Sequence, residues 1–253
     1  MSNQGKVAII TGATSGIGFE VARRMAKEGY TVAINGRRED EGAKRIAEME
    51  AEGLKAEFYP FDVTDENAVS SNIKQIGEKY GKIDVLVNNA GGLGGRSRFE
   101  EMTTDFFRKV MALNLDSVFF ASRAAIPFLK NGENSTIINF TSNAGWNAGG
   151  PGAGIYGTSK AGVHAITRAL AKDLAEYGIR VNAVSPGTID TPFHSQIKST
   201  KPEVFASWAN NILLGRLGQP EDIAGVVAFL ASKDASFMTA ETVQIGGGQA
   251  LGI

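Results

Sequence analysis

A tyrosine and a lysine lie four residues apart in the segment YGTSK, at Tyr156 and Lys160. The segment follows a glycine-rich stretch and opens a predicted long helix, on which residues i and i+4 share one face. A free tyrosine titrates near pH ~10. A cation within a few ångströms favours the phenolate and can lower this pKa by ~1–3. The pair therefore predicts a proton-transfer site in which Tyr156 is the acid or base and Lys160 tunes it.

Two polar residues upstream could serve the same reaction. Ser142 ends the apolar run STIINFTS, and its hydroxyl could hydrogen-bond the reacting oxygen. Asn114 lies in the apolar segment VMALNLDSVFF, where a polar side chain needs a partner. Each residue also has a structural interpretation, as a surface tyrosine, a solvated lysine, a strand-end serine or a buried amide. Their occurrence together, downstream of a glycine loop, favours catalysis.

The glycine loop lies in IITGATSGIG, between a predicted strand and a predicted helix. Glycines at such a turn let the backbone approach a pyrophosphate, which then rests against the helix N-terminus. The spacing G-x-x-x-G-x-G differs from the usual G-x-G-x-x-G, and a tight structural turn is the alternative. The position at the start of an alternating fold favours a dinucleotide site. Its expected residues are Gly12, Thr14, Ser15, Gly16, Ile17 and Gly18.

The end of the second predicted strand indicates which dinucleotide is bound. An NAD site commonly has an acidic residue there, on the ribose 2′-hydroxyl. Here the sequence is INGRRED, with Arg37 and Arg38 where the acid would lie. A guanidinium suits a 2′-phosphate, so NADP(H) is the preferred cofactor and NAD(H) a possible one. The alternative is two solvated arginines that open a charged helix.

The elements that must position these residues alternate along the whole chain. Seven apolar runs separated by helical stretches predict an α/β fold of the doubly wound, Rossmann type, with helices on both faces of a seven-stranded parallel sheet. Nothing divides the chain, so residues 1–253 are interpreted as one domain, with 188–215 as an insertion that covers the substrate. The predicted strands are 6–11, 31–35, 56–63, 83–89, 135–142, 179–187 and 241–247, and the longest helical regions are 103–130 and 154–177.

Composition excludes several classes of function. The formal net charge is −1 and no basic run exceeds two residues, so a nucleic-acid footprint is missing. There are no cysteines and two histidines, which leaves no expected metal site. No apolar run approaches the ~20 residues that span a bilayer, and the N-terminus lacks signal-peptide organisation. We therefore expect a cytoplasmic protein.

The motifs, taken in order, resemble those of the short-chain dehydrogenase/reductase family over essentially the whole chain. They are the glycine loop, NNAG at 88–91, Asn114, Ser142, YGTSK and SPG at 185–187. The resemblance extends to the 3-oxoacyl-carrier-protein reductases and sugar dehydrogenases of that family. It implies an NAD(P)-dependent enzyme that acts on CH–OH donors or carbonyls, and a homotetramer.

The resemblance also implies roles for individual residues. Asn114, Ser142, Tyr156 and Lys160 would form a catalytic tetrad, in which Asn114 holds a water that passes protons to the lysine. Tyr156 and Lys160 would also contact the cofactor. The other implied cofactor residues are Asp62 and Val63 at the adenine, Asn88 (partly structural), Ala90 and Gly91 at the fourth strand, and Pro186, Gly187, Ile189 and Thr191 at the nicotinamide end.

The expected substrate site contains polar and aromatic residues, namely Arg96, Arg98, Asn143, Trp146, Asn147 and His194. This set favours a sugar-derived keto acid or aldehyde of the uronate type. The alternatives are a 3-oxoacyl thioester on an acidic carrier protein and, from a different class, a dinucleotide sensor without catalysis. An epimerase or dehydratase is disfavoured by length. His164, two turns after Tyr156, is interpreted as a core or interface residue.

Overall fold

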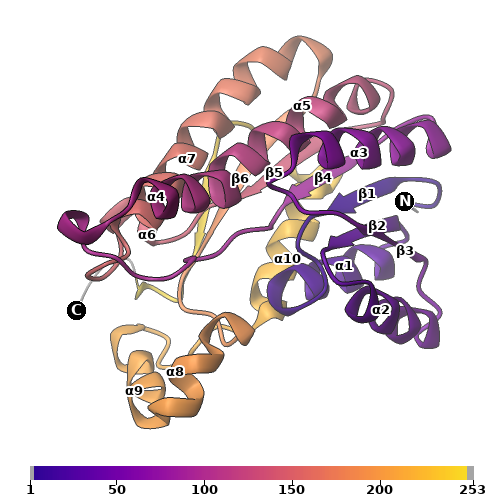
Figure 1. Ribbon diagram of the computed structural model, residues 1–253. Helices are drawn as coiled ribbons and strands as arrows, with labels where there is room; N and C mark the ends of the chain where they lie inside the picture. Colours follow the sequence, from indigo (N-terminus) through magenta and orange to yellow (C-terminus); the bar gives the residue numbers. More distant parts are fainter. Residues whose placement is uncertain (1–2, 250–253) are drawn as a thin grey trace.

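The computed structural model describes residues 3–249. Its seven strands form one parallel sheet (Figure 1). Its strand order is β3-β2-β1-β4-β5-β6-β7, so the chain starts at β1, winds to one edge and then returns to wind to the other. In such a sheet, ligands bind outside the carboxyl ends of the strands, where the order reverses. The strands are β1 (Val7–Ile10), β2 (Thr31–Gly36), β3 (Ala56–Pro60), β4 (Val85–Asn88), β5 (Thr136–Phe140), β6 (Arg180–Pro186) and β7 (Thr242–Ile245).

Helices cover both faces of the sheet, which confirms the predicted fold class (Figure 1). Successive strand residues point to opposite faces. Ala8 and Ile10 of β1 therefore pack in one core with α1 and α10, and Val7 and Ile9 pack in the other with α3, α5 and α7. The longer helices are α1 (Gly16–Lys27), α2 (Glu39–Ala51), α3 (Glu66–Tyr80), α4 (Thr104–Met111), α5 (Ser117–Leu129), α7 (Gly154–Leu174) and α10 (Pro220–Ala231).

The predicted helix over 103–130 is interrupted in its middle. Between α4 and α5 the chain widens into a π-helical turn, η2 (Ala112–Asp116). Asn114 lies at its centre and is fully buried, with Nδ2 donating to the carbonyl oxygen of Val110 (2.9 Å). Such widened turns often occur at functional sites, where they redirect a side chain. Here the turn directs the amide of Asn114 toward the chain that leaves β4.

Residues 188–215 extend from the end of β6 as a small lobe (orange in Figure 1). An aromatic cluster organises it, with the ring of His194 at 5.8 Å from Phe205 and 5.2 Å from Trp208. The remaining short elements include α6 (Ala144–Asn147), which follows β5. The others are α8 (Ser195–Thr200), α9 (Pro202–Ser207), η1 (Phe99–Glu101), η3 (Ala175–Tyr177), η4 (Pro192–His194), η5 (Trp208–Asn211) and η6 (Lys233–Ala235).

None of the helices within residues 3–249 is both long enough and apolar enough to cross a bilayer.

Candidate active site

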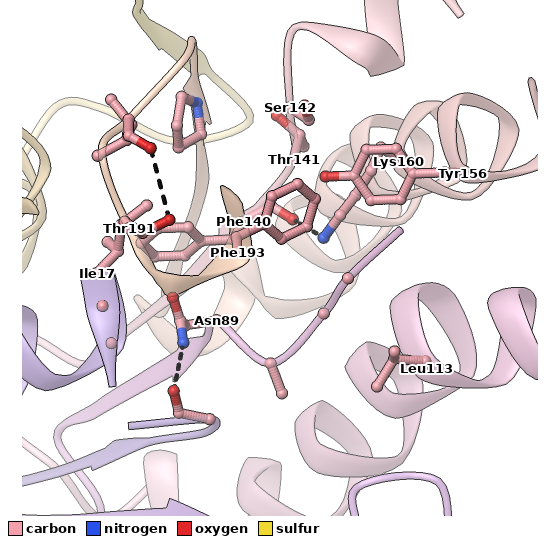
Figure 2. A pocket seen from close by; sticks show the side chains of 18 of the residues that line it. Ile17, Asn89, Leu113, Phe140, Thr141, Ser142, Tyr156, Lys160, Thr191 and Phe193 are labelled. Carbon is pink, nitrogen blue, oxygen red and sulfur yellow. Dashed lines mark hydrogen bonds between the residues drawn. The ribbon is translucent and has the colours of Figure 1, made fainter. Parts of the chain in front are cut away.

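A pocket of about 790 Å³ opens at the carboxyl ends of five strands. Gly12 follows β1, Gly36 ends β2, Asn89 follows β4, Thr141 follows β5 and Pro186 ends β6, and all five line it. Figure 2 shows Ser142 and Tyr156 on one side of this space and Thr191 and Phe193 of the lobe on another. Segments far apart in the sequence therefore share one cavity, as the strand order requires.

The glycine loop lines the pocket next to the N-terminus of α1. Gly12 and Gly16 have φ values of 61° and 55°, in the left-handed region that favours glycine. A Cβ on Gly18 would lie 2.4 Å from Asn89 Nδ2 and 2.5 Å from the Gly12 carbonyl oxygen. Ser15, at the N-cap of α1, makes no side-chain cap, so the first N–H groups of the helix remain available. This cradle fits the pyrophosphate of a dinucleotide. All six predicted loop residues line the pocket.

Two neighbouring asparagines at the end of β4 differ in position, and only Asn88 was predicted to contact the cofactor. Asn88 does not line the pocket, because its buried amide donates to Ser122 Oγ (3.1 Å) and Asn139 Oδ1 (2.9 Å). Asn89, which was not predicted, does line it and donates to the carbonyl oxygens of Thr11 (2.9 Å) and Gly12 (3.0 Å). The structure thus gives Asn88 a buried, structural position, which agrees with the structural part of its predicted role. Alternation along a strand sends the two side chains opposite ways.

Downstream of Asn89, both Ala90 and Gly91 line the pocket as predicted, as does Gly92.

The end of β2 separates the two predicted arginines. Arg37 lines the pocket, with its side chain 77% exposed and NH1 at 3.9 Å from Asp62 Oδ2. Arg38 does not line it and pairs instead with Glu41 on α2. Its side chain turns instead to the first turn of α2, where Glu41 lies. Asn35, at the strand end, accepts from the backbone N–H of Gly12 (3.2 Å).

Asp62 and Val63 line the same end of the pocket, as predicted. Burial acts to raise the pKa of Asp62. Two hydrogen bonds from Thr64, from its N–H (2.9 Å) and its hydroxyl (2.8 Å), together with the charge of Arg37, outweigh it and lower the pKa. Asp62 therefore stays ionised and holds its turn in place.

Ser142, Tyr156 and Lys160 converge at the other end (Figure 2). Tyr156 lies in the first turn of α7, with its hydroxyl near the side chain of Ser142. Lys160, one turn later, is 3% exposed, and its Nζ donates to the Phe140 carbonyl oxygen (2.8 Å). Its Nζ lies 6.0 Å from the centre of the Tyr156 ring.

The protonation of this pair differs from the sequence-based expectation. Burial raises the pKa of Tyr156, and the nearby side chain of Ser142 opposes this only in part. Burial also lowers the pKa of Lys160 to about 8. The prediction that Lys160 lowers the pKa of Tyr156 is therefore wrong for the protein alone. Desolvation disfavours the charged form of each group. Tyr156 is thus held as a phenol, the form that donates a proton.

Asn114 reaches the site through the backbone. Its Oδ1 accepts from Gly92 N (2.9 Å), and its Nδ2 donates to Gly92 O (2.9 Å) as well as to Val110 O. A Cβ on Gly91 would lie 2.8 Å from Asn114 Oδ1 and 3.0 Å from Lys160 Nζ. The side chain does not line the pocket. Asn114 therefore holds the segment after β4 close to Lys160.

The predicted substrate residues divide into two groups. Asn143, Asn147 and His194 line the pocket, and so do all four residues expected at the nicotinamide end, Pro186, Gly187, Ile189 and Thr191. Arg96, Arg98 and Trp146 do not line it. Arg96 donates to Pro151 O (2.8 Å). Trp146 donates to Ser185 Oγ (3.3 Å) and packs on His164, with 4.3 Å between ring centres.

His164 is buried beneath Trp146, with Nδ1 at 3.1 Å from Thr242 Oγ1. Burial, with the charges of Arg168 and Lys160, lowers its pKa. A neutral core histidine, as interpreted from the sequence, matches this environment.

Sequence reasoning missed several lining residues besides Asn89. Lys109 and Leu113 come from α4 and η2, one helical turn apart, and Phe193 comes from the lobe. Gln249 also lines the pocket, and its Oε1 accepts from Thr188 N (2.8 Å). The spacing of Lys109 and Leu113 is a detectable signal, but nothing local distinguishes them from the rest of an amphipathic helix.

Among residues 3–249, no three histidine, aspartate or glutamate side chains lie close enough together to hold a metal ion.

Comparison with known proteins places this geometry among reductases and dehydrogenases. A family profile described as enoyl-(acyl carrier protein) reductase matches residues 12–250. The 3-oxoacyl-[acyl-carrier-protein] reductase FabG of Thermotoga maritima is 40% identical over 250 residues, which span 98% of this chain and 99% of the relative. The 2-dehydro-3-deoxy-L-rhamnonate dehydrogenase (NAD(+)) of a Sphingomonas species is 36% identical over 245 residues, which span 97% and 95%.

A solved structure gives the same result in three dimensions. The actinorhodin polyketide ketoreductase, determined with NADPH, superposes with a TM-score of 0.91 at 33% identity and with 99% of each chain covered.

Proposed function

The chain belongs to the short-chain dehydrogenase/reductase family, and we propose that it is an oxidoreductase that transfers hydride between NADP(H) and a sugar-derived keto acid or aldehyde of the uronate type. The observation that carries the proposal is the pocket itself. It joins a glycine cradle under α1 to a phenol, a serine hydroxyl and a buried lysine at its other end. A dinucleotide-binding protein without catalysis would not need the second end.

In the proposed reduction, Tyr156 donates its phenolic proton to the carbonyl oxygen of the substrate. Ser142 donates a hydrogen bond to the same oxygen and stabilises the charge that develops on it. When bound, the nicotinamide supplies the hydride to the carbonyl carbon or accepts it in the reverse direction. Lys160, with its pKa lowered to about 8 by burial, can exchange a proton near neutral pH and so help to restore the phenol.

The preference for NADP(H) is proposed from Arg37. This guanidinium lines the pocket at the end of β2, where the turn residues Asn35 and Gly36 offer no carboxylate to a ribose 2′-hydroxyl. Asp62 is its charged neighbour, at 3.9 Å, too far for a strong hydrogen bond. Arg37 is therefore available to a 2′-phosphate.

Replacing Arg37 with alanine tests this preference. We expect the KM for NADPH to rise about tenfold, because a charged hydrogen bond to phosphate is lost, and the KM for NADH to change little. Arg38→Ala is the matched control, since it removes the same charge from outside the pocket. Equal effects of Arg37→Ala on both cofactors would show that this side chain does not contact the phosphate.

The substrate class is proposed from the amides and the imidazole of Asn143, Asn147 and His194, which offer hydrogen bonds to hydroxyl groups. A 3-oxoacyl thioester is the second candidate, supported by the name of the Thermotoga maritima relative. Initial rates with keto-sugar acids, keto-sugars and 3-oxoacyl thioesters, read by NADPH absorbance, distinguish the two. Tight NADPH binding without turnover of any carbonyl would instead favour a sensor.

We also propose that the protein is a homotetramer. The family resemblance implies this assembly, and Phe107 on α4 and Phe119 on α5, each 43% exposed, offer apolar surface to a second copy. Light scattering after size-exclusion chromatography would measure the mass. A monomer at micromolar concentration would refute this assembly.

A further inference from the structure

Charges are unevenly distributed along the pocket. Four residues that line it carry full charges, namely Arg37, Asp62, Lys109 and Lys160. Arg37 and Asp62 lie together at the end near β2 and β3. Lys109 and Lys160 belong to α4 and α7, at the end that contains Tyr156. Among residues 3–249, no carboxylate lines that end.

The two lysines differ in what they contact. Lys160 is buried, and its Nζ is already bound to the carbonyl oxygen of Phe140. Lys109 is exposed, and within the described part of the chain its ammonium group makes no hydrogen bond or ion pair. Asp105, one helical turn before it, does not form a salt bridge with it. Lys109 therefore offers an uncompensated positive charge.

The position of Lys109 directs that charge at the reacting end of the pocket. Lys109 lies one helical turn before Leu113, on the same face of the helix, and both residues line the pocket. Figure 2 shows Leu113 on the wall opposite the loop of Ser142, below Tyr156 and Lys160. A substrate whose carbonyl meets Tyr156 would thus extend past Leu113 toward the ammonium of Lys109.

We propose that Lys109 forms an anion-binding subsite, which receives a charged group of the substrate remote from its reacting carbonyl. The inference rests on the proposed function and adds a requirement to it: the preferred substrate carries a negative charge. Two sources of that charge are chemically equivalent here, the carboxylate of a keto-sugar acid and a phosphate on the arm of an acyl thioester.

Matched pairs of carbonyl compounds test the subsite. 5-Keto-D-gluconate and L-sorbose differ only in a carboxylate against a hydroxymethyl group, and acetoacetyl-4′-phosphopantetheine and acetoacetyl-pantetheine differ only in a phosphate. Steady-state rates with NADPH would be measured for the wild-type enzyme, for Lys109→Met and for Arg108→Met. Arg108 is the control because it is the next residue on the same helix, is also exposed and does not line the pocket.

We expect the charged member of at least one pair to have the lower KM in the wild type. Lys109→Met should raise that KM about tenfold, as expected for one ion pair at a pocket wall, and leave the neutral member and NADPH unchanged. Arg108→Met should change neither. The pair that responds identifies whether the anion is a carboxylate or a phosphate.

Two results would overturn the proposal, and they differ from each other. Turnover without any preference for the charged member, or an equal effect of Lys109→Met and Arg108→Met, would refute the subsite and leave the oxidoreductase intact. Failure of the wild type to reduce any of the four compounds, or any other carbonyl, would refute the proposed function, and the subsite with it.

Discussion

Replacing Lys160 with methionine should abolish activity and, at neutral pH, make the folded protein more stable. The ammonium group of Lys160 is buried, and its Nζ has one hydrogen bond, to Phe140 O at 2.8 Å. No carboxylate contributes to its titration, since burial is the cause that lowers its pKa from 10.5 to about 8. The protein therefore holds an uncompensated charge in its interior.

The size of this cost follows from the shift. Each pH unit of displacement corresponds to ~1.4 kcal/mol, so at pH 7 the buried charge destabilises the fold by about 3 kcal/mol. Methionine has a similar length and needs no solvation, but it leaves the Phe140 carbonyl without this donor, which costs ~1 kcal/mol. The net expectation for Lys160→Met is a gain of about 2 kcal/mol in the free energy of unfolding, or ~4–8 °C in Tm.

The gain should depend on pH in one direction only. Below pH 8, the folded and unfolded states both hold the lysine proton, so the cost is present in full. Between pH 8 and pH 10.5, the folded state releases the proton first and the unfolded state binds more protons, so the stability of the wild type rises with pH relative to the mutant. The advantage of methionine should shrink across this window and disappear near its upper end.

Urea denaturation at pH 7, 8, 9 and 10, at one protein concentration, measures this difference. Lys172→Met is the control, because Lys172 lies on the same helix but is exposed, and its removal should change stability by less than ~0.5 kcal/mol at every pH. An unchanged stability of Lys160→Met at pH 7, or a gain that persists at pH 10, would refute the assignment of a buried and destabilising charge.

Two further predictions concern the two ends of the pocket. Tyr156→Phe should lower kcat by about 10²–10⁴-fold through loss of the proton donor while the Kd for NADPH stays the same, and comparable turnover would remove Tyr156 from the mechanism. Gly18→Ala should lower the free energy of unfolding by ~1–3 kcal/mol and weaken NADPH binding, because its Cβ would lie 2.5 Å from the Gly12 carbonyl oxygen. Gly225→Ala on α10 is its control: the nearest atom there is 3.9 Å away, so only the helix propensity of alanine acts, which stabilises by ~1 kcal/mol.

Local pattern was sufficient for the fold and for much of the pocket. Apolar runs separated by amphipathic stretches predict a parallel sheet covered on both faces, and its strand ends meet at one edge. Gly12, shortly after β1, and Ser142, shortly after β5, were therefore placed in the pocket by their positions near strand ends, and the family resemblance added Pro186, at the end of β6. Tyr156 and Lys160 could be paired because the helix fixes their spacing.

Local pattern was insufficient where the direction of a side chain depends on neighbours far away in the sequence. Asn88 and Asn89 are adjacent, and only the packing of α5 against β4 decides which one turns inward to Ser122. Trp146 lies in α6 between Ala144 and Asn147, which line the pocket, yet its ring packs on His164 of α7. A short stretch of sequence does not reveal such contacts. The polar and aromatic composition therefore suggested that Trp146 contacts substrate, whereas in the structure its ring packs against His164.

The protonation of the Tyr156–Lys160 pair shows the same limit in energetic form. Proximity of a cation to a phenol, read from spacing, predicts a lowered tyrosine pKa. Burial disfavours both the ammonium and the phenolate, and here it outweighs their mutual attraction, since Lys160 lies 6.0 Å from the Tyr156 ring and its Nζ is bound to Phe140 O. At pH 7 the site therefore holds a protonated tyrosine, ready to donate, beside a lysine that still carries its proton and releases it near pH 8. The same desolvation lowers the pKa of Lys160 to about 8 and raises the pKa of Tyr156, so the two shifts have one cause. Only a ligand that brings compensating charge can change one of these pKa values without the other.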